Sequence, residues 1–188
     1  VIACSSLFAP NEYDIPEHTG EYVVVNVMKL GGHYSFKQSI KKSNWNSVFQ
    51  QVYSELKRNY NVVFSCHDEF EKESALNIDP KAQIFTSEHF VDYLRFYAKA
   101  SFGLVNRVHA AFALASFGKP SVVVGNDSRT RMLDEIGVEH LFVNNASTEL
   151  LLEKMIQLEQ NKKQFADFMQ SRKQQAFNDY LAQLEMVS

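Results

Sequence analysis

The feature that most constrains the fold is a repeated order along the chain, in which a short apolar run precedes a segment with helical spacing. The run over residues 22–28 (YVVVNVM) is continuous and rich in β-branched residues, which predicts a strand buried on both faces. Residues 44–60 then carry apolar side chains at the spacing of an amphipathic helix. Repeated alternation of this kind predicts an open, mostly parallel sheet with right-handed crossovers and helices on both faces.

The pattern predicts about six strands, at residues 22–28, 61–66, 82–86, 102–106, 121–125 and 141–144. Helices are expected at 44–60, at 88–99 behind an N-cap at Ser87, at 108–117, from Asp127 or Ser128 to Gly137, and onward from Thr148. The fold class that follows is α/β: a doubly wound, Rossmann-like domain with a C-terminal helical tail.

Three segments are expected along the chain. Residues 1–21 are rich in turn formers and predict a linker or hinge from an N-terminal domain, since the chain has no initiator methionine and begins inside an apolar stretch. Residues 22–160 are predicted to form the α/β domain, and 161–188 an amphipathic helix. That helix either packs on its own domain or crosses back to the N-terminal domain, and its aromatic residues also permit a homodimer.

Composition narrows the classes of partner. Of the 188 residues 45% are hydrophobic, which supports a core, and 19 basic and 22 acidic side chains are spread evenly, so we expect no nucleic-acid partner. The apolar runs fall far short of the roughly 20 residues of a membrane helix, so we expect no transmembrane segment. Two cysteines and the absence of a signal peptide suggest a cytoplasmic protein, free or at the inner face of the membrane.

Candidate functional residues follow the fourth and fifth predicted strands, where ligands bind in open α/β sheets. Asn106, Arg107 and His109 stand where one helix begins, and Asn126 and Arg129 where the next begins. Backbone N–H groups at a helix start and bidentate arginines both favour phosphate and carboxylate groups. The sequence therefore predicts an anion site, although each arginine alone is also typical of a salt-bridged surface group, and the histidine of a helix cap.

Two other strand ends carry weaker candidates. The loop KLGGH after the first strand contains Gly31 and Gly32, which we predict to contact substrate although the loop is not a G-x-G-x-x-G motif. His67, Asp68 and Glu69 after the second strand are of metal-ligand type, but adjacent side chains diverge and no second cluster has metal spacing. We therefore predict a solvated loop there, and neither a metal nor a cofactor.

The run FGLVNRVHAAFALASFGKPSVVVGNDSRTRMLDEIGV resembles the signature of the polysaccharide pyruvyl transferases. In that family a strand leads into Arg-x-His and an alanine-rich helix, and Gly-x-Pro then precedes a strand, an Asp-x-Lys/Arg segment and a helix ending at glycine. The matching residues are Arg107, His109, Gly118, Pro120, Asp127, Arg129 and Gly137. The chain departs from the pattern at Asn106, where serine is frequent, and at Val108, where leucine is common.

The resemblance implies the C-terminal, donor-binding domain of a two-lobed, GT-B-type enzyme of exopolysaccharide biosynthesis. Phosphoenolpyruvate would be the donor, and a saccharide hydroxyl pair the acceptor that becomes a pyruvate ketal. The family also uses residues of the N-terminal lobe, including a basic one, which lie outside this chain.

Ketal formation from an enol phosphate requires a proton on the methylene carbon and the departure of phosphate. Our hypothesis makes His109 the general acid, Arg107 the ligand of the carboxylate or phosphate, and Arg129 the group that steadies the leaving phosphate. Two alternatives remain open. One is half of a nucleotide-sugar glycosyltransferase or epimerase, with a nucleotide at the arginines. The other is a non-catalytic α/β interaction module with His109 buried away from any cleft.

Overall fold

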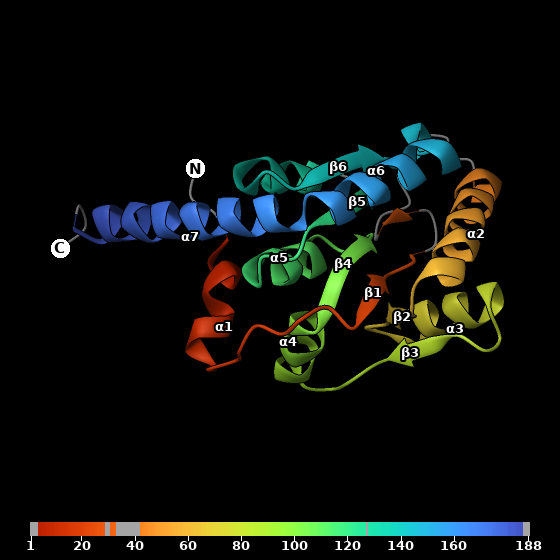
Figure 1. Ribbon diagram of the computed structural model, residues 1–188, viewed down its shortest axis with the longest axis horizontal. Helices are drawn as coiled ribbons and strands as arrows, with labels where there is room; N and C mark the ends of the chain where they lie inside the picture. Colours follow the sequence, from red (N-terminus) through yellow and green to blue (C-terminus); the bar gives the residue numbers. More distant parts are fainter. Residues whose placement is uncertain (1–3, 29–30, 33–41, 127, 186–188) are drawn as a thin grey trace.

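The computed structural model describes residues 4–28, 31–32, 42–126 and 128–185, and within them one parallel sheet runs in the order β3-β2-β1-β4-β5-β6 (Figure 1). Its strands are β1 (Tyr22–Val25), β2 (Val62–Ser65), β3 (Gln83–Phe85), β4 (Ala100–Val105), β5 (Ser121–Gly125) and β6 (Glu139–Phe142). The predicted doubly wound, Rossmann-like α/β class is confirmed.

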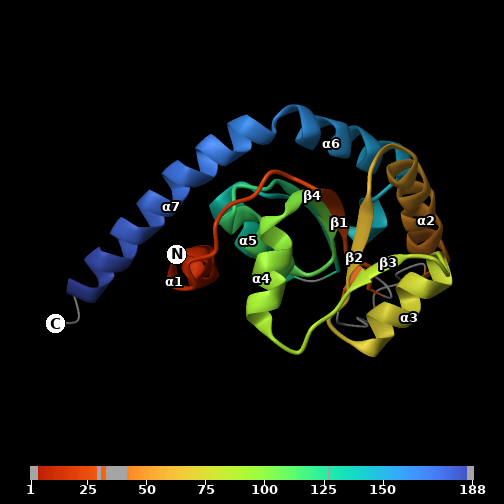
Figure 2. The same cartoon turned by 60° about the horizontal axis from the view of Figure 1, so that its bottom comes forward.

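Helices cover both faces of the sheet (Figures 1 and 2). One face packs against α2 (Lys42–Asn59), α3 (Glu69–Ile78) and α6 (Thr148–Gln160). The other packs against η1 (Ser5–Phe8), α4 (Phe90–Ala98), α5 (Val108–Ser116), the 3-10 helix η3 (Ser128–Ile136) and α7 (Lys162–Glu185). Two short elements complete the described chain, α1 (Ala9–Glu12) and η4 (Val143–Asn145).

The apolar strands supply the core of both layers. In β1, Val24 faces the α4–α5 layer while Val23 and Val25 face the α2–α6 layer, and all three are at most 1% exposed. Successive side chains of a strand point to opposite faces, so a strand covered on both sides needs an unbroken apolar run. Full burial of each such valine contributes about 1.5–3 kcal/mol, which is why these runs form the centre of the fold.

The N-terminal part of α7 packs on the α/β domain of the same chain. Gly118 and Gly137, which end α5 and η3, have φ angles of +65° and +62° and lie against α7. An added Cβ on Gly118 would lie 3.1 Å from Ala166 Cβ, and Met169 is 1% exposed. The last turns of α7 project past the sheet and its helical layers (Figure 2). Its crossing to another domain stays a prediction.

The segment interpreted as a linker begins with helical structure. Residues 5–12 form η1 and α1, and Leu7 is completely buried in the core beside α5. Pro10 is the reason for the difference, because proline is as typical of the first turn of a helix as of a turn. A connection to a further domain stays a prediction.

The solvated loop predicted after the second strand is shorter than expected: His67 and Asp68 form a bend, Asp68 and Glu69 are exposed, and α3 begins at Glu69. Asp68 is the N-cap of α3, and its side chain accepts a hydrogen bond from Glu71 N at 2.8 Å. The sequence D-x-x-E is a capping-box pattern and could have revealed this helix. Two smaller differences concern helix starts: α4 begins at Phe90 rather than at Glu88, and Asp127, one of two predicted caps of the helix after β5, lies outside the described residues.

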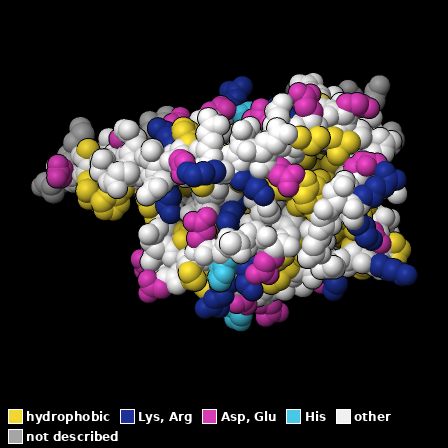
Figure 3. Space-filling view, viewed as in Figure 1, with side chains coloured by type: hydrophobic (Ala, Val, Ile, Leu, Met, Phe, Trp, Pro, Cys, Tyr) yellow, Lys and Arg dark blue, Asp and Glu magenta, His cyan; other side chains and the backbone are white. Residues whose placement is uncertain are grey.

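The surface carries charges of both signs. On the face shown in Figure 3, lysine and arginine side chains are interspersed with aspartate and glutamate, and no large basic patch is visible. Among the helices that the structure describes, none combines the length and the apolar character needed to span a membrane.

Candidate functional site

The strand order creates a crevice between β1 and β4. The chain extends the sheet from β1 through β2 to β3 on one side, and from β4 through β5 to β6 on the other. The place where the direction reverses is the switch point, and ligands of such sheets bind there, beyond the carboxyl ends of the strands. A cavity of about 360 Å³ lies there, and we call it the switch-point cavity. Its lining comprises Ser6, Ala9, Gly31, Gly32, His67, Phe90, Tyr93, Leu94, Tyr97, Asn106, Arg107, Val108, His109, Ala110, Ala113, Gly125, Arg129, Thr130 and Met132.

The cavity brings together most of the residues selected from the sequence. Arg107, His109 and Arg129 all line it, as do Gly31, Gly32 and Asn106. The His109 side chain is exposed, whereas the non-catalytic alternative predicted a buried imidazole away from any cleft. Six of the seven predicted site residues therefore surround one opening.

The first turn of α5 lines the cavity. Arg107 is the extended N-cap residue, and Val108, His109 and Ala110 line the cavity from the first turn. This nine-residue helix has no acidic side chain in its first turn, so the positive end of its dipole is not neutralised locally. Such a terminus is suited to a phosphate or carboxylate group.

Arg107 forms two ion pairs. Its Nε donates to Glu71 Oε1 at 2.7 Å and its Nη2 to Asp68 Oδ2 at 3.0 Å, with 20% of the side chain exposed. This is the salt-bridged alternative that the sequence left open for an arginine after a strand. A ligand anion would therefore compete with both carboxylates for the Arg107 guanidinium.

Glu71 was not selected from the sequence, yet it connects the two sides of the cavity. Its side chain is 3% exposed, and Oε2 accepts a hydrogen bond from His67 N at 2.7 Å while Oε1 accepts from Arg107. Burial raises the pKa of Glu71, and the His67 hydrogen bond and the Arg107 charge oppose that rise. The charge on Arg107 is therefore offset by a carboxylate that is itself costly to ionise.

Two buried asparagines hold the strand ends in register. Asn26 Oδ1 accepts from Asn106 N and Arg107 N at 3.3 and 3.2 Å, and its Nδ2 donates to Ser65 O at 2.9 Å. Asn106 Oδ1 accepts from Met28 N at 2.7 Å, and its Nδ2 donates to Val124 O at 2.7 Å. The Asn106 amide, predicted to bind substrate, is instead used to join the ends of β1, β4 and β5.

The glycines after β1 permit a close approach of two loops. Gly31 has a φ of +70°, and an added Cβ on Gly32 would lie only 2.0 Å from Asn126 Oδ1. A side chain at residue 32 would therefore displace the buried Asn126, which lies behind Gly32 and is not among the residues that line the cavity. Lys29, Leu30 and His33 of the same predicted loop are outside the described residues.

An aromatic wall was not predicted. The rings of His67 and Tyr93 stack at 4.3 Å with an interplanar angle of 11°. His67 Nε2 lies 3.2 Å from Tyr97 Oη and 3.3 Å from Ser65 Oγ, and these two hydroxyls lie 2.8 Å apart. His67 is therefore half-buried and fixed. The sequence signal was its place directly after β2, together with Tyr93 and Tyr97 one helical turn apart.

The described residues contain no group of three or more histidine, cysteine, aspartate or glutamate side chains arranged to hold a metal ion. Cys66, at the end of β2, is buried, and burial raises the pKa of its thiol to about 12. It is therefore protonated at neutral pH and a poor nucleophile.

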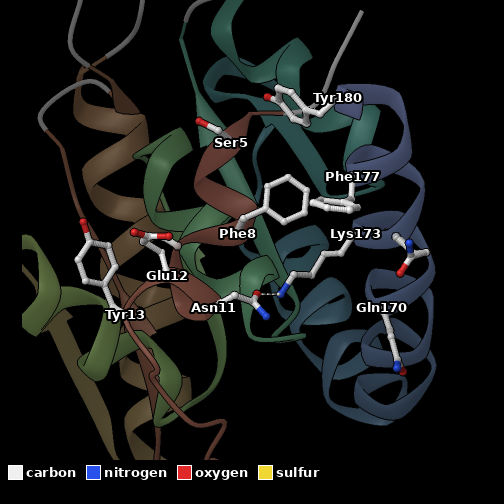
Figure 4. A pocket seen from close by; sticks show the side chains of 11 residues that line it. Ser5, Phe8, Asn11, Glu12, Tyr13, Gln170, Lys173, Phe177 and Tyr180 are labelled. Carbon is white, nitrogen blue, oxygen red and sulfur yellow. Dashed lines mark hydrogen bonds between the residues drawn. The ribbon is translucent and has the colours of Figure 1, made fainter. Parts of the chain in front are cut away.

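A larger hollow of about 840 Å³ lies between α1 and α7 (Figure 4). Its centre is aromatic, with the Phe8 ring 6.2 Å from Phe177 and 5.9 Å from Tyr180, and Lys173 Nζ lies 3.3 Å from Asn11 Oδ1. No strand end contributes to its lining. The charged groups expected of an anion site converge at the switch-point cavity instead.

Comparison with known proteins identifies the fold. No protein-family model and no curated protein sequence matches the chain. Among solved structures it is similar to the E. coli heptosyltransferase WaaC with ADP, at a TM-score of 0.54 and 11% identity over 78% of this chain and 47% of that one. A weaker match is the glycosyltransferase SnogD from Streptomyces nogalater, with a TM-score of 0.43 and 10% identity over 88% of this chain and 43% of that one.

The chain thus spans less than half the length of either structure. The match to WaaC and the strand order together show a GT-B-like Rossmann fold.

Proposed function

We propose that this chain is the donor-binding lobe of a two-lobed, sugar-modifying transferase, and that the switch-point cavity holds the phosphate of an activated donor. The observation that carries the proposal is the convergence of Arg129, His109 and the α5 N-terminus on one cavity. Each of these groups stabilises negative charge, and a leaving phosphate develops such charge in the transition state.

The donor we favour is a nucleoside diphosphate sugar. The cavity volume of about 360 Å³ falls in the range of roughly 300–1,000 Å³ typical of sites for ligands with ring systems. Tyr93, Leu94 and Met132 add apolar surface to its lining. The E. coli heptosyltransferase that shares this fold was solved with ADP, which has the same combination of a ring and phosphates.

Pyruvyl transfer from phosphoenolpyruvate is the second candidate, because the Arg-Val-His run and Arg129 line the same cavity. In that reaction His109 would protonate the methylene carbon, and two acceptor hydroxyl oxygens would lose their protons and bond to the neighbouring carbon as its bond to the phosphate oxygen breaks. Arg129 and the α5 N-terminus would steady the departing phosphate. Arg107 would bind the carboxylate after leaving Asp68 or Glu71.

Both candidates place a saccharide acceptor on a separate N-terminal lobe. Under both we retain a cytoplasmic location, free or at the inner face of the membrane, and the option of a homodimer through α7.

Isothermal titration of the chain with ADP, UDP, GDP and phosphoenolpyruvate separates the candidates. We expect one nucleoside diphosphate to bind most tightly, and Arg129→Ala to weaken it. Arg131→Ala is the matched control, because Arg131 lies on the same 3-10 helix, is exposed and does not line the cavity. Tighter binding of phosphoenolpyruvate would favour pyruvyl transfer, and no binding by any of the four would overturn the proposal.

A further inference from the structure

We propose that His67 is a ligand-contacting residue of the switch-point cavity and the group that makes anion binding there depend on pH. This inference rests on the proposed function, because it requires an anionic donor in the cavity. The sequence directed attention to His109, whereas the structure presents a second imidazole, that of His67, in the lining of the same cavity.

The two imidazoles differ in how firmly they are held. His109 is exposed and makes no hydrogen bond with the described residues, so a ligand would have to order it. His67 stacks on Tyr93, and its Nε2 lies within hydrogen-bond distance of the Tyr97 and Ser65 hydroxyls. Ordering a side chain on binding costs about 0.5–1.5 kcal/mol in conformational entropy. His67 is already ordered in the folded protein, so ligand binding does not incur this loss there. His67 is therefore the better organised of the two for a directed hydrogen bond.

His67 also has its backbone tied to the charged wall. His67 N donates to Glu71 Oε2, and Glu71 Oε1 accepts from Arg107 Nε, each at 2.7 Å. One carboxylate thus connects the imidazole-bearing residue with the arginine at the start of α5. Because Glu71 and Asp68 already offset Arg107, the imidazolium form of His67 would add positive charge to this part of the cavity lining.

The surroundings of His67 determine the sign of the pH effect. The titratable and charged side chains that adjoin His67 or share the cavity lining with it are Cys66, Asp68, Glu71, Tyr93, Tyr97, Arg107, His109 and Arg129. A bound phosphate adds negative charge beside the imidazole and favours its protonated form. Binding therefore takes up a proton at His67, and affinity falls as the pH rises through its pKa.

The test is an NMR titration of the chain labelled with ¹³C in its histidine rings, with ADP and separately with inorganic pyrophosphate as probes. We expect the pKa of His67 to rise by about one pH unit when either probe binds. His18 and His140 do not line the cavity and serve as internal controls that should not move.

His67→Gln supplies an independent readout, because glutamine keeps a polar group near the position of Nε2 but does not titrate. We expect the fall in ADP affinity between about pH 6 and pH 8 to become smaller than in the wild type, because only His109 and the phosphate of ADP itself still titrate there. A merely structural role would instead lower affinity equally at every pH. If the variant does not fold, the wild-type titration decides alone.

The outcomes separate the two claims. Binding of ADP or pyrophosphate with an unmoved His67 resonance would overturn this inference and leave the proposed function standing. Failure of both probes to bind would remove the proposed function, and the role of His67 with it.

Discussion

The two walls of the switch-point cavity are built in different ways. The charged wall consists of Arg107, His109 and Arg129, which directly follow β4 and β5. The aromatic wall consists of His67, Tyr93 and Tyr97, which come from the end of β2 and from a helix about thirty residues further along. Local sequence places the charged wall, whereas packing of α4 against β2 creates the aromatic wall. Residues that follow strand ends therefore predict the charged wall, whereas Tyr93 and Tyr97 join the site only through the packing of α4.

Asn106→Ala should have the largest effect, because it removes the side chain that holds the charged wall in place. The substitution leaves Met28 N and Val124 O buried without their partner, so we expect the free energy of unfolding to fall by about 2–4 kcal/mol. Urea denaturation measures this. The control is Asn178→Ala on the exposed side of α7, which should change it by less than about 0.5 kcal/mol. A loss below about 1 kcal/mol for Asn106→Ala would show that the asparagine does not organise this wall.

Arg129→Ala should weaken pyrophosphate and ADP alike by about 10- to 100-fold, as expected for loss of a charged hydrogen-bond donor. Phe90→Ala should weaken ADP by only about 2- to 10-fold and leave pyrophosphate unchanged, because pyrophosphate has no ring to contact the apolar side. Phe90 lines the cavity and is 59% exposed, so its removal does not disturb the core. Calorimetry with both ligands measures the contrast. Equal losses for both ligands in Phe90→Ala would show that Phe90 does not contact the ring of ADP.

Tyr97→Phe should lower the free energy of unfolding by about 0.5–1.5 kcal/mol, because the buried hydroxyl lies 2.8 Å from Ser65 Oγ and 3.2 Å from His67 Nε2. Thermal unfolding of the variant beside the wild type measures the change. Tyr13→Phe is the matched control, since Tyr13 is 45% exposed and lies at the α1–α7 hollow, away from this wall. An unchanged transition temperature in Tyr97→Phe would mean that the hydroxyl does not fix the aromatic wall.

Glu71 connects the two walls through its hydrogen bonds to His67 N and Arg107 Nε, and Glu71→Gln tests how its ionisation contributes to stability at different pH values. Because burial raises the folded-state pKa of Glu71 above 4.5, its contribution to stability is fully present below about pH 4.5 and is lost as the pH rises through the raised value. The wild-type stability minus that of the variant should therefore fall as pH increases above about 4.5. Urea denaturation at several pH values measures this difference. A difference that grows with pH would mean that the Arg107 ion pair outweighs burial.

The sequence was sufficient for the sheet because the strand runs are unbroken. Val23 to Val25 and Val122 to Val124 have no polar residue to suggest exposure, and the glycines at 118 and 137 end their helices as predicted. The charged wall was predictable for the same local reason, since Arg107, His109 and Arg129 directly follow strand ends.

Other features depend on contacts between distant residues. The partners of Arg107, at residues 68 and 71, are separated from it by more than thirty positions, so its ion pairs leave no local signal at residue 107. Asn106 is of a residue type that often binds ligands. Only the positions of Met28 and Val124 show that its side-chain amide instead forms hydrogen bonds with the backbone.

The proposed function and the proposed role of His67 both require an anion that binds at the carboxyl ends of β1 and β4. Titration of the ¹⁵N-labelled chain with pyrophosphate, followed through backbone amide resonances, tests this binding directly. We expect the largest shifts at Val108, His109 and Ala110 and at Arg129 and Thr130. Shifts confined to the α1–α7 hollow around Phe8 and Lys173, or no shifts at all, would contradict it.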